Sequence, residues 1–354
     1  MKKLLTIAMA VLMTLALLTS CGKNNSEPSA SSNPTGDDTP AVKVACLLNG
    51  NLGDKSFFDS ANAGMELIKS ELNAETKVIE MGFDNTKWEP TLLDISEQDY
   101  DIIIVGTYQM EEILEKVAPQ YPNKKYIIFD SSVDYTKDDY KNVYAVTFKQ
   151  NEASYLAGAL ASMIAMDDSL PLSNGEGIIG AVAAMDIPVL NDFMIGYIEG
   201  AKAVNPDVKV VLSYIGDFND TAKAKELASA QFKLGACISM NVAAQAGLGL
   251  IDAAKAEQRY AIGVDADQAM SLLETNPEAA NVIVTSVMKN IDKVIERSVK
   301  LHLEGKLPYG TTESLGMAEE AVGIANNEIY QNIATEDMRN QITEMAAKIQ
   351  NGEI

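Results

Sequence analysis

The sequence predicts an α/β protein made of two similar lobes, each a doubly wound parallel sheet, with a hinge between them. Short apolar runs rich in β-branched residues alternate with segments of helical spacing along most of the chain, which is typical of parallel strands buried on both faces. The same series of runs occurs twice, at an offset of about 135 residues. About 310 residues follow an N-terminal leader and linker, a length that suits two lobes better than one core.

Each expected strand corresponds to one apolar run, and most runs are followed by a segment of helical spacing. Examples of such segments are DSANAGMELIKSEL and NDFMIGYIEGAKAV, in which apolar residues recur at every third or fourth position. Strands that alternate with helices in this way lie parallel in a doubly wound sheet. The expected strands are, in chain order, VKVACLL, KVIEMG, DIIIVG, KYIIFD, VYAVTF, GIIGAV, VKVVLSYI, ACISM, YAIGV and VIVTSV.

The chain begins with an export signal. Two lysines precede an apolar run from Leu4 to Leu18, and the sequence LTSC then ends at Cys21. The run is shorter than the about 20 apolar residues of a spanning helix and lies close to a small-residue cleavage site. The pattern resembles a bacterial lipoprotein signal, with an uncleaved anchor as the alternative. We therefore expect residues 1–20 to be a signal peptide and Cys21 to carry a lipid that holds the protein on the extracytoplasmic face of the cell membrane.

The segment after Cys21 is expected to be a tether. Residues 22–41 consist largely of Ser, Asn, Pro, Gly and Asp with no apolar periodicity, so they cannot bury enough surface to fold. Residues 21–41 would then form a lipidated, flexible linker that lets the folded part stand off the membrane.

Charge and residue usage exclude several classes of function. Fifty acidic residues against 28 basic ones give a formal net charge of −22, and no basic stripe with interleaved aromatic residues is present, so nucleic acid is not an expected partner. The chain has one histidine, His302, which is too few for a histidine metal cluster, and no cofactor is expected. Cys46 and Cys237 each lie in an apolar run, where they are expected to be small buried hydrophobic residues.

The internal repeat defines the two lobes and their equivalent positions. One match would be chance, but a single offset kept across five strands indicates two lobes of like topology. The equivalent pairs are Val44 and Ile179, Phe57 and Phe193 at two expected helix openings, Gly82 and Gly216, Asp130 and Asp265, and, at a slightly larger offset, Lys149 and Lys289. We expect lobe 1 to contain residues 42–151 and about 285–310, lobe 2 to contain residues 152–284 and about 311–354, and the hinge to cross near residues 145–152, 283–288 and 308–318.

Two lobes that face each other define a cleft. Ligands of open α/β sheets bind outside the carboxyl ends of the strands. Asp130 and Asp265 each follow an apolar strand at equivalent positions, so we expect them to approach one ligand from opposite lobes, although each could instead cap a helix or shape a turn. The polar residues expected at such strand ends are Asn49, Asp54, Asp130, Asp186, Asn241, Asp265 and Lys289.

Six segments together resemble one known family. They are GDKSFF (53–58), YLAG (155–158), AAMDIPVLNDFMIGYIEGAKAVNPDVKV (183–210), GDFND (216–220), AIGVDADQ (261–268) and TSVMKNID (285–292). The chain is similar to the basic membrane protein family of bacterial lipoproteins, the nucleoside-binding branch of the substrate-binding proteins of ABC importers. The resemblance covers nearly all of the chain after the tether. It implies the type I periplasmic binding protein fold, in a monomer that delivers its ligand to an ABC permease in the membrane.

The resemblance also implies a ligand and roles for individual residues. The ligand would be a purine nucleoside (guanosine, inosine or adenosine) in the cleft, with its base between aromatic rings and its ribose hydroxyls on carboxylates. The residues carried over are Asp130 and Asp265 on the ribose with Lys289 and Asn241 nearby, Phe57 on one face of the base, and either Phe193 or Phe218 on the other; Asn49 and Asp54 would line the cleft. The family usually has asparagine where this chain has Phe58, so the role of Phe58 and the preferred purine stay open.

Two other functions remain alternatives at this point. A sugar-binding lipoprotein of the same fold would also use aromatic rings and carboxylates, and a surface receptor module would present its ligand to a sensor. An enzyme is not expected, because the Gly-x-Gly sequence from Gly247 to Gly249 lies in AAQAGLGLIDAAKA. This pattern is more typical of close helix packing than of a phosphate-binding loop.

Overall fold

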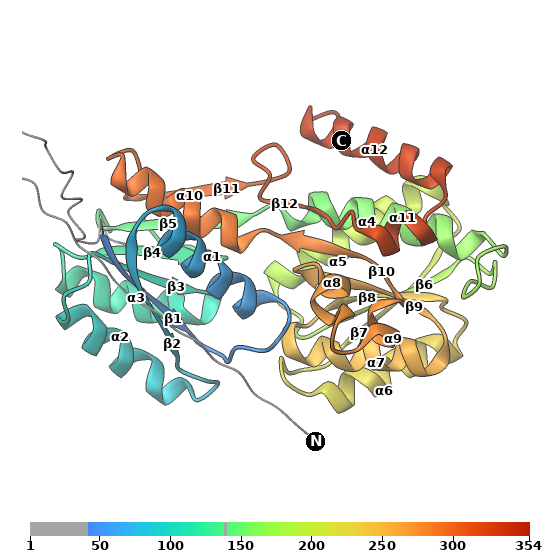
Figure 1. Cartoon of the computed structure of the whole chain (residues 1–354), viewed down its shortest axis with the longest axis horizontal. Coiled ribbons are helices and arrows are strands. Elements are labelled where there is room, and N and C mark those ends of the chain that lie inside the picture. Colours follow the sequence, from blue (N-terminus) through green and yellow to red (C-terminus); the bar gives the residue numbers. More distant parts are fainter. Residues whose placement is uncertain (1–41, 138–139) are drawn as a thin grey trace, which may run out of the picture. The chain divides into compact units, whose positions relative to one another are not determined.

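The computed structural model describes residues 42–137 and 140–354 (Figure 1). Residues Pro40–Ile354 form one compact unit. The expected signal peptide, the lipidation site at Cys21 and the tether lie outside the described residues. Within the described part of the chain, none of the helices has the length and apolar character needed to span a membrane.

Lobe 1 is a six-stranded parallel sheet with helices on both faces. Its strands lie in the order β11-β5-β4-β3-β1-β2, and every neighbouring pair is parallel. The elements are β1 (Val42–Leu48), α1 (Phe57–Glu71), β2 (Ala74–Glu80), η1 (Asn85–Lys87), α2 (Trp88–Glu97), β3 (Ile102–Gly106), η2 (Tyr108–Met110), α3 (Glu111–Val117), η3 (Ala118–Gln120), β4 (Lys125–Phe129), β5 (Val143–Phe148), α10 (Ile291–Leu303) and β11 (Thr311–Leu315).

Lobe 2 repeats this arrangement. Its order is β12-β10-β9-β8-β6-β7, and only β12 is antiparallel to its neighbour. Because β6 to β10 take the places of β1 to β5, the predicted duplicated α/β fold is confirmed. The elements are α4 (Gln150–Met166), β6 (Ile178–Ala183), α5 (Pro188–Val204), β7 (Lys209–Tyr214), α6 (Thr221–Lys233), β8 (Ile238–Val242), η4 (Ala244–Gly247), α7 (Leu248–Glu257), β9 (Tyr260–Asp265), α8 (Gln268–Leu273), α9 (Pro277–Ala280), β10 (Ile283–Lys289), β12 (Val322–Ile324), α11 (Glu328–Ile333) and α12 (Glu336–Gln350).

Two of the expected lobe boundaries differ from those in the structure. Strand β10 hydrogen-bonds to β9, so residues 285–289 belong to the sheet of lobe 2 and not to lobe 1. Strand β11 hydrogen-bonds to β5, so residues 311–315 belong to the sheet of lobe 1 and not to lobe 2, and α10 packs on α1 of lobe 1 (Figure 1). A strand belongs to the sheet whose backbone groups it satisfies, and the length of the chain between strands does not reveal that partner.

The three connections between the lobes follow β5, β10 and β11. They hydrogen-bond to one another, because the Lys149 amide donates to the Leu315 carbonyl at 2.8 Å and the Asn290 amide donates to the Ala321 carbonyl at 2.9 Å. The Glu152 carboxylate on α4 also accepts from the Met317 amide at 2.7 Å. The three connections between the lobes are therefore hydrogen-bonded to one another and are not independent linkers.

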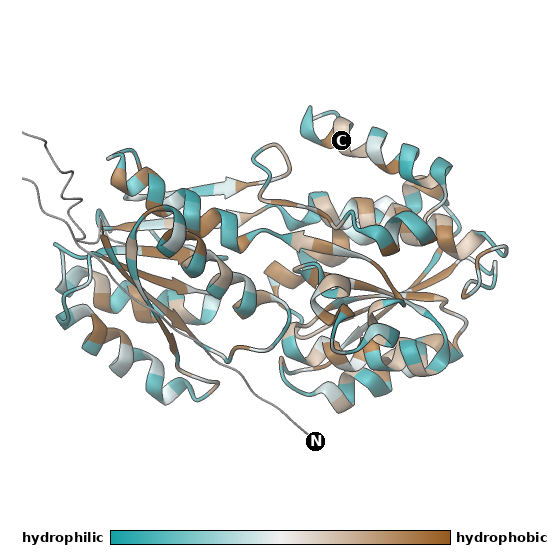
Figure 2. Cartoon of the chain, viewed as in Figure 1, coloured by the Kyte–Doolittle hydropathy of each residue, from teal (hydrophilic) through white to brown (hydrophobic). Residues whose placement is uncertain are grey.

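The core of each lobe lies between its sheet and the covering helices. The central strands are apolar parts of the ribbon in Figure 2 and their side chains are almost all buried, whereas the edge strands β2, β7 and β11 carry mostly exposed or half-buried side chains. Both Cys46 and Cys237 are free and fully buried, as predicted. Helix α5 begins at Pro188 and not at Phe193 as expected, because proline at the first helical position needs no amide partner and already has a helical φ.

Candidate functional site

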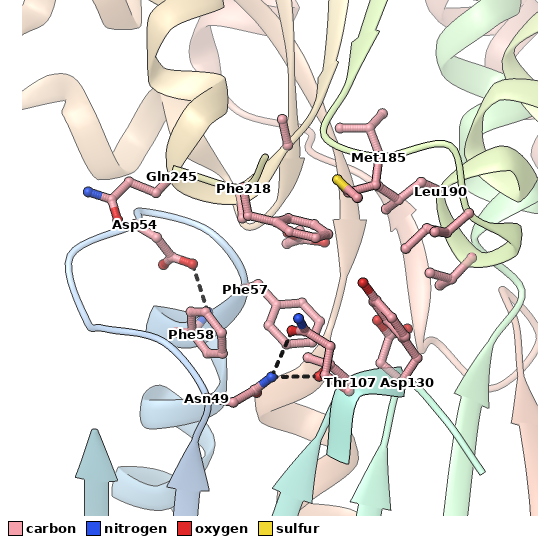
Figure 3. A pocket seen from close by; sticks show the side chains of 18 of the residues that line it. Asn49, Asp54, Phe57, Phe58, Thr107, Asp130, Met185, Leu190, Phe218 and Gln245 are labelled. Atoms are coloured by element: carbon pink, nitrogen blue, oxygen red, sulfur yellow. Dashed lines mark hydrogen bonds between the residues drawn. The ribbon is translucent and has the colours of Figure 1, made fainter. Parts of the chain in front are cut away.

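The carboxyl ends of the strands in both lobes meet around a cavity of about 270 Å³ (Figure 3). In the figure, Phe218, Met185 and Leu190 reach into it from lobe 2, opposite Asn49, Phe57 and Asp130 of lobe 1. Every predicted ligand residue except Asn241 lines it: Asn49, Asp54, Phe57, Phe58, Asp130, Phe193, Phe218, Asp265 and Lys289. Asp186, which was also expected at a strand end facing the cleft, does not line it and accepts from the Asn191 side chain instead. The cavity is therefore the place where the two halves of the repeat meet.

Asp130 and Asp265 share an unusual backbone conformation. Asp130 directly follows β4 and has φ 61°, and Asp265 is the last residue of β9 and has φ 62°. A positive φ is uncommon outside glycine, and aspartate is among the residues that tolerate it. Such a conformation costs of order 1–3 kcal/mol and persists only where the surrounding structure imposes it. The internal repeat is therefore seen in the backbone conformation of these two aspartates as well as in the strand order.

Asp130 is bonded across the cleft. The Lys289 ammonium of lobe 2 donates to Asp130 Oδ1 at 2.6 Å, and the Lys289 side chain is only 2% exposed. The Lys289 Nζ also lies 5.0 Å from the centroid of the Phe193 ring. Burial raises the pKa of the Asp130 carboxyl, while the Lys289 ammonium opposes this shift. One oxygen of Asp130 remains available to a ligand, since the described bond uses Oδ1 alone.

Asp265 is also bonded across the cleft. The Ser56 hydroxyl of lobe 1 donates to Asp265 Oδ2 at 2.5 Å. Burial raises the pKa of Asp265 to about 6, although Lys289 and Ser56 act to lower it. Ser56 was not among the predicted ligand residues, although it lies within the family-like GDKSFF segment, because its cross-lobe partner is 209 residues away.

Asp54 holds the loop in front of α1. Its Oδ1 accepts from the Ser56 and Asp59 amides at 3.0 and 3.1 Å, and its Oδ2 accepts from the Phe58 amide at 2.9 Å. The residue is 1% exposed. These bonds satisfy amides that a helix leaves free at its N-terminus. Asp54 therefore shapes the wall of the cavity by fixing the loop.

The two adjacent phenylalanines both face the cavity and both pack into the core. Phe57 and Phe58 are 8% and 7% exposed and meet edge to face, with ring centroids 5.4 Å apart. The Phe57 ring also packs on Phe129, with centroids 5.5 Å apart. The Phe58 ring fills the space beside Gly50, where an added Cβ would lie 2.1 Å from the ring. Phe58 thus has a packing role that forbids a side chain at position 50.

Phe218 is the better placed of the two candidates for the opposing ring. It is half-buried, lines the cavity and lies across it from Phe57 and Phe58 in Figure 3. Phe193 also lines the cavity, but it is 1% exposed and its ring faces the Lys289 ammonium. Phe193 is therefore a buried residue of the cavity wall that packs against Lys289.

Asn241 lies behind the cavity wall. It is fully buried, and its Nδ2 donates to Gln268 Oε1 at 3.1 Å. The same Gln268 oxygen accepts from the Val264 amide at 3.1 Å, next to Asp265 in the chain. The structure therefore gives Asn241 a place in the support of the loop that carries Asp265.

Asn49 presents an unsatisfied acceptor. Its Nδ2 donates to Thr107 Oγ1 at 2.8 Å and to Gln109 Oε1 at 3.0 Å, and these two bonds, drawn in Figure 3, fix the orientation of the amide. Its Oδ1 has no hydrogen-bond partner among the described residues, although Asn49 is only 2% exposed. Leaving a buried acceptor unpaired costs about 1–3 kcal/mol, so this oxygen favours a ligand that donates a hydrogen bond.

Sequence reasoning missed several lining residues. Thr107, Tyr108 and Gln109 directly follow β3, so the rule that ligands bind at carboxyl strand ends could have found them. Phe83 and Trp88 follow β2, but their contribution depends on how the chain turns into α2. In the described part of the chain, no group of three or more His, Cys, Asp or Glu side chains is placed to hold a metal ion.

Comparisons with known proteins agree with the predicted family and fold. The model of the family described as ABC transporter substrate-binding protein PnrA-like matches residues 41–354. The ABC transporter nucleoside-binding protein BmpA of Lactococcus lactis subsp. cremoris is 24% identical over 367 residues, which cover 100% of this chain and 98% of that protein. An uncharacterized lipoprotein of Pyrococcus abyssi is 30% identical over 338 residues, covering 91% of this chain and 77% of that protein.

A solved structure extends the agreement to three dimensions. The crystal structure of an ABC transporter system solute-binding protein from Aeropyrum pernix K1 matches with a TM-score of 0.77 at 29% identity, covering 88% of this chain and 92% of that chain. The type I periplasmic binding protein fold and the family resemblance are therefore both confirmed. The chain belongs to the basic membrane protein family of PnrA-like ABC transporter substrate-binding proteins, which are extracytoplasmic binding proteins and not enzymes.

Proposed function

We propose that the protein captures a purine nucleoside in the cavity between its lobes and delivers it to an ABC permease, while a lipid on Cys21 holds it at the membrane. The observation that carries this proposal is the pair Asp130 and Asp265. They occupy equivalent positions of the two lobes and line the same aromatic cavity. The Lactococcus lactis relative that matches along its whole length is named a nucleoside-binding protein, which supports the same ligand class.

The chemistry of the cavity suits the two halves of a nucleoside. A carboxylate accepts hydrogen bonds from both hydroxyls of a cis-diol, and such charge-assisted bonds are roughly twice as strong as neutral ones. The rings of Phe57 and Phe218 suit the faces of a base, since stacking is worth about 1–3 kcal/mol per base. Asn49 Oδ1 would accept from an N–H of the base edge. The ribose would then lie toward Asp130 and Asp265, and the base toward the rings.

Binding would be coupled to closure of the cleft. The ribose and base contacts come from both lobes, so all of them form together only when the lobes are closed. A ligand shifts an open–closed equilibrium by its difference in affinity for the two states. The bonds from Lys289 to Asp130 and from Ser56 to Asp265 already join the lobes, so the ligand would add to a preformed set of cross-lobe contacts. The permease would recognise the closed form.

Thermal unfolding with a panel of ligands tests the proposal. Guanosine, inosine or adenosine at about 100 times its dissociation constant should stabilise the protein by about 2.7 kcal/mol, whereas ribose and galactose should not. Asp265→Ala and Asp130→Asn should fold and lose most of this shift, while Asp252→Ala on the exposed face of α7 should keep it. A midpoint that responds to hexoses and to no nucleoside would disprove the proposal and favour a sugar-binding protein.

The pH dependence of binding provides a second test. Burial raises the pKa of Asp265 from 3.8 to about 6, so the folded protein binds more protons than the unfolded chain between these values. This contribution to stability is present below pH 3.8 and is lost as the pH rises through about 6. Nucleoside binding has the opposite pH dependence, because the hydroxyl groups of the ligand donate to the ionised carboxylate. Nucleoside affinity should be level above about pH 7 and fall by up to about tenfold per pH unit below pH 6.

The control for the pH test is Asp265→Asn. The amide accepts hydrogen bonds but does not titrate, so its weaker binding should be independent of pH across this window. Calorimetric titrations at pH 5, 6 and 7 measure both profiles. An unaltered pH dependence in the variant would mean that another group titrates and that Asp265 does not bind the ligand as a carboxylate.

A further inference from the structure

A second cavity of about 570 Å³ adjoins the first, on the other side of Asp130. The two cavities share Tyr108, Asp130, Ile187 and Val189 as lining residues. The first cavity, at about 270 Å³, lies just below the range for small-molecule sites, about 300–1,000 Å³. The second cavity offers more room than the first and also lies between the lobes, beside the residues of the hinge.

The charged groups around the second cavity are all acidic. Among its lining residues are Glu111, Asp130, Asp134 and Asp192, and no lysine or arginine. Lys289 pairs with Asp130, and Lys137 lies 3.7 Å from Asp134. Glu111 of lobe 1 and Asp192 of lobe 2 form no ion pair with any residue that the structure describes. Two carboxylates without an ion-pair partner among the described residues therefore face this space from opposite lobes. The Glu111 carboxylate accepts from the Ser131 hydroxyl at 3.0 Å, and the charge of Lys289 acts on Asp192 from a distance.

A buried acceptor lies beside the same cavity, on a side chain that is bonded to Asp192. Gln150 lines it and is only 3% exposed. The Gln150 Nε2 donates to the Val189 carbonyl at 3.2 Å and to Asp192 Oδ2 at 3.1 Å, which fixes the amide. The Gln150 Oε1 is buried and has no hydrogen-bond partner among the described residues. Together with the carboxylates, this oxygen favours a group that carries hydrogen-bond donors and positive charge.

Helix α5 does little to offset this preference. The N-terminus of a helix attracts anions through its free amides, and Pro188 at the start of α5 lines the cavity. Proline has no amide hydrogen, and the Leu190 and Asn191 amides both donate to the Ile187 carbonyl. The first turn of α5 therefore has few free donors for a phosphate, and Asp192 lies on the next turn.

The ribose has one position left to point into this space. The base occupies C1′, and the hydroxyls on C2′ and C3′ would bond to the carboxylates near Asp130 and Asp265, so the remaining substituent is on C5′. We propose that the cleft takes purine nucleosides with a cationic or amine-bearing group at C5′, held in the second cavity between Glu111 and Asp192, and rejects 5′-phosphates. This inference rests on the proposed nucleoside function and narrows its ligand class.

Three matched ligands test the inference by calorimetry on the purified full chain. Adenosine, 5′-amino-5′-deoxyadenosine and adenosine 5′-monophosphate differ only at C5′. The amine should bind at least about fivefold more tightly than adenosine at low salt, the scale of one partly exposed ion pair, and the advantage should shrink as salt is raised. The monophosphate should bind at least about tenfold more weakly than adenosine, because the charged side chains that line the second cavity are all carboxylates and Lys289 is already paired with Asp130.

Variants locate the effect in the second cavity. In Glu111→Gln with Asp192→Asn, the ratio of the amine and adenosine affinities should fall toward one, and the monophosphate should recover part of its loss. Glu112→Gln, at an exposed neighbouring position on α3, should keep the wild-type ratio. Adenosine binding with no preference for the amine, or equal binding of the monophosphate, would overturn this inference and leave the proposed function standing. Failure of all three ligands together with guanosine and inosine would overturn both.

Discussion

Replacing Lys289 with methionine should open the cleft and weaken nucleoside binding by about 100-fold, or about 2.7 kcal/mol. Lys289 is 2% exposed and donates to Asp130 at 2.6 Å, and its charge also lowers the pKa of Asp265. Without it, two buried carboxylates face each other across the cleft with no cation between them. Because they belong to different lobes, separation of the lobes would return both to water. Small-angle scattering should therefore give a larger radius of gyration than for the wild type.

The pH separates this explanation from a general loss of structure. The pKa values of Asp130 and Asp265 should rise further in Lys289→Met, so lowering the pH to about 5 should neutralise them and close the cleft again. Adding Asp130→Asn should also restore part of the closure. Lys293→Met, at an exposed position on α10, should change neither the radius nor the affinity. A Lys289→Met protein with the wild-type radius and affinity would contradict the assigned role of this ion pair.

Replacing Gly200 with alanine should lower the free energy of unfolding by about 2–3 kcal/mol. Helices α4 and α5 pack with their backbones in contact: a Cβ at Gly200 would lie 1.8 Å from the Tyr155 carbonyl oxygen, and one at Gly158 would lie 1.9 Å from the Tyr197 carbonyl oxygen. A backbone atom cannot move aside as a flexible side chain can, so the helices must separate. This loss should exceed the gain of about 1 kcal/mol in helix propensity from glycine to alanine.

Urea unfolding followed by circular dichroism measures this effect. Lys202→Ala, at an exposed position of the same helix, should change stability by no more than about 0.5 kcal/mol. Hydrogen exchange should show faster exchange in α4 and α5 of Gly200→Ala and little change in lobe 1. If Gly200→Ala were as stable as the wild type, the two helices would have room that their described packing does not allow.

Much of the fold could be predicted from the sequence because its signals are local. A run such as VKVACLL indicates a buried strand by its own composition, and the repeat needs only a comparison of one half of the chain with the other. The same reasoning led to Asp130 and Asp265, since a residue at the carboxyl end of a buried parallel strand lies at the binding edge of its sheet. Asn241, which was placed by the same rule, lies behind the cavity, because it is the fourth residue of β8 and does not follow its end.

The equivalent lysines mark the limit of this reasoning. Lys149 and Lys289 correspond in the repeat, but the Lys149 side chain is 47% exposed and lies 3.7 Å from Glu152, whereas Lys289 is buried on Asp130. The difference arises because β10 continues through Lys289, whereas β5 ends before Lys149, whose amide pairs with Leu315 of the hinge. Nothing within either run distinguishes the two residues.

Local sequence patterns were enough to predict two duplicated α/β lobes, a cleft at their strand ends, and an opposed pair of aspartates within it. These features follow from hydrophobic pattern and strand order, which each segment carries locally. The tertiary structure alone decided which strands crossed to the other lobe, which lysine entered the cleft, the bond from Ser56 to Asp265 and the second acidic cavity. Such features depend on contacts between segments that are not adjacent in the chain, such as Asp130 and Lys289, which are 159 residues apart, and only the folded chain brings them together.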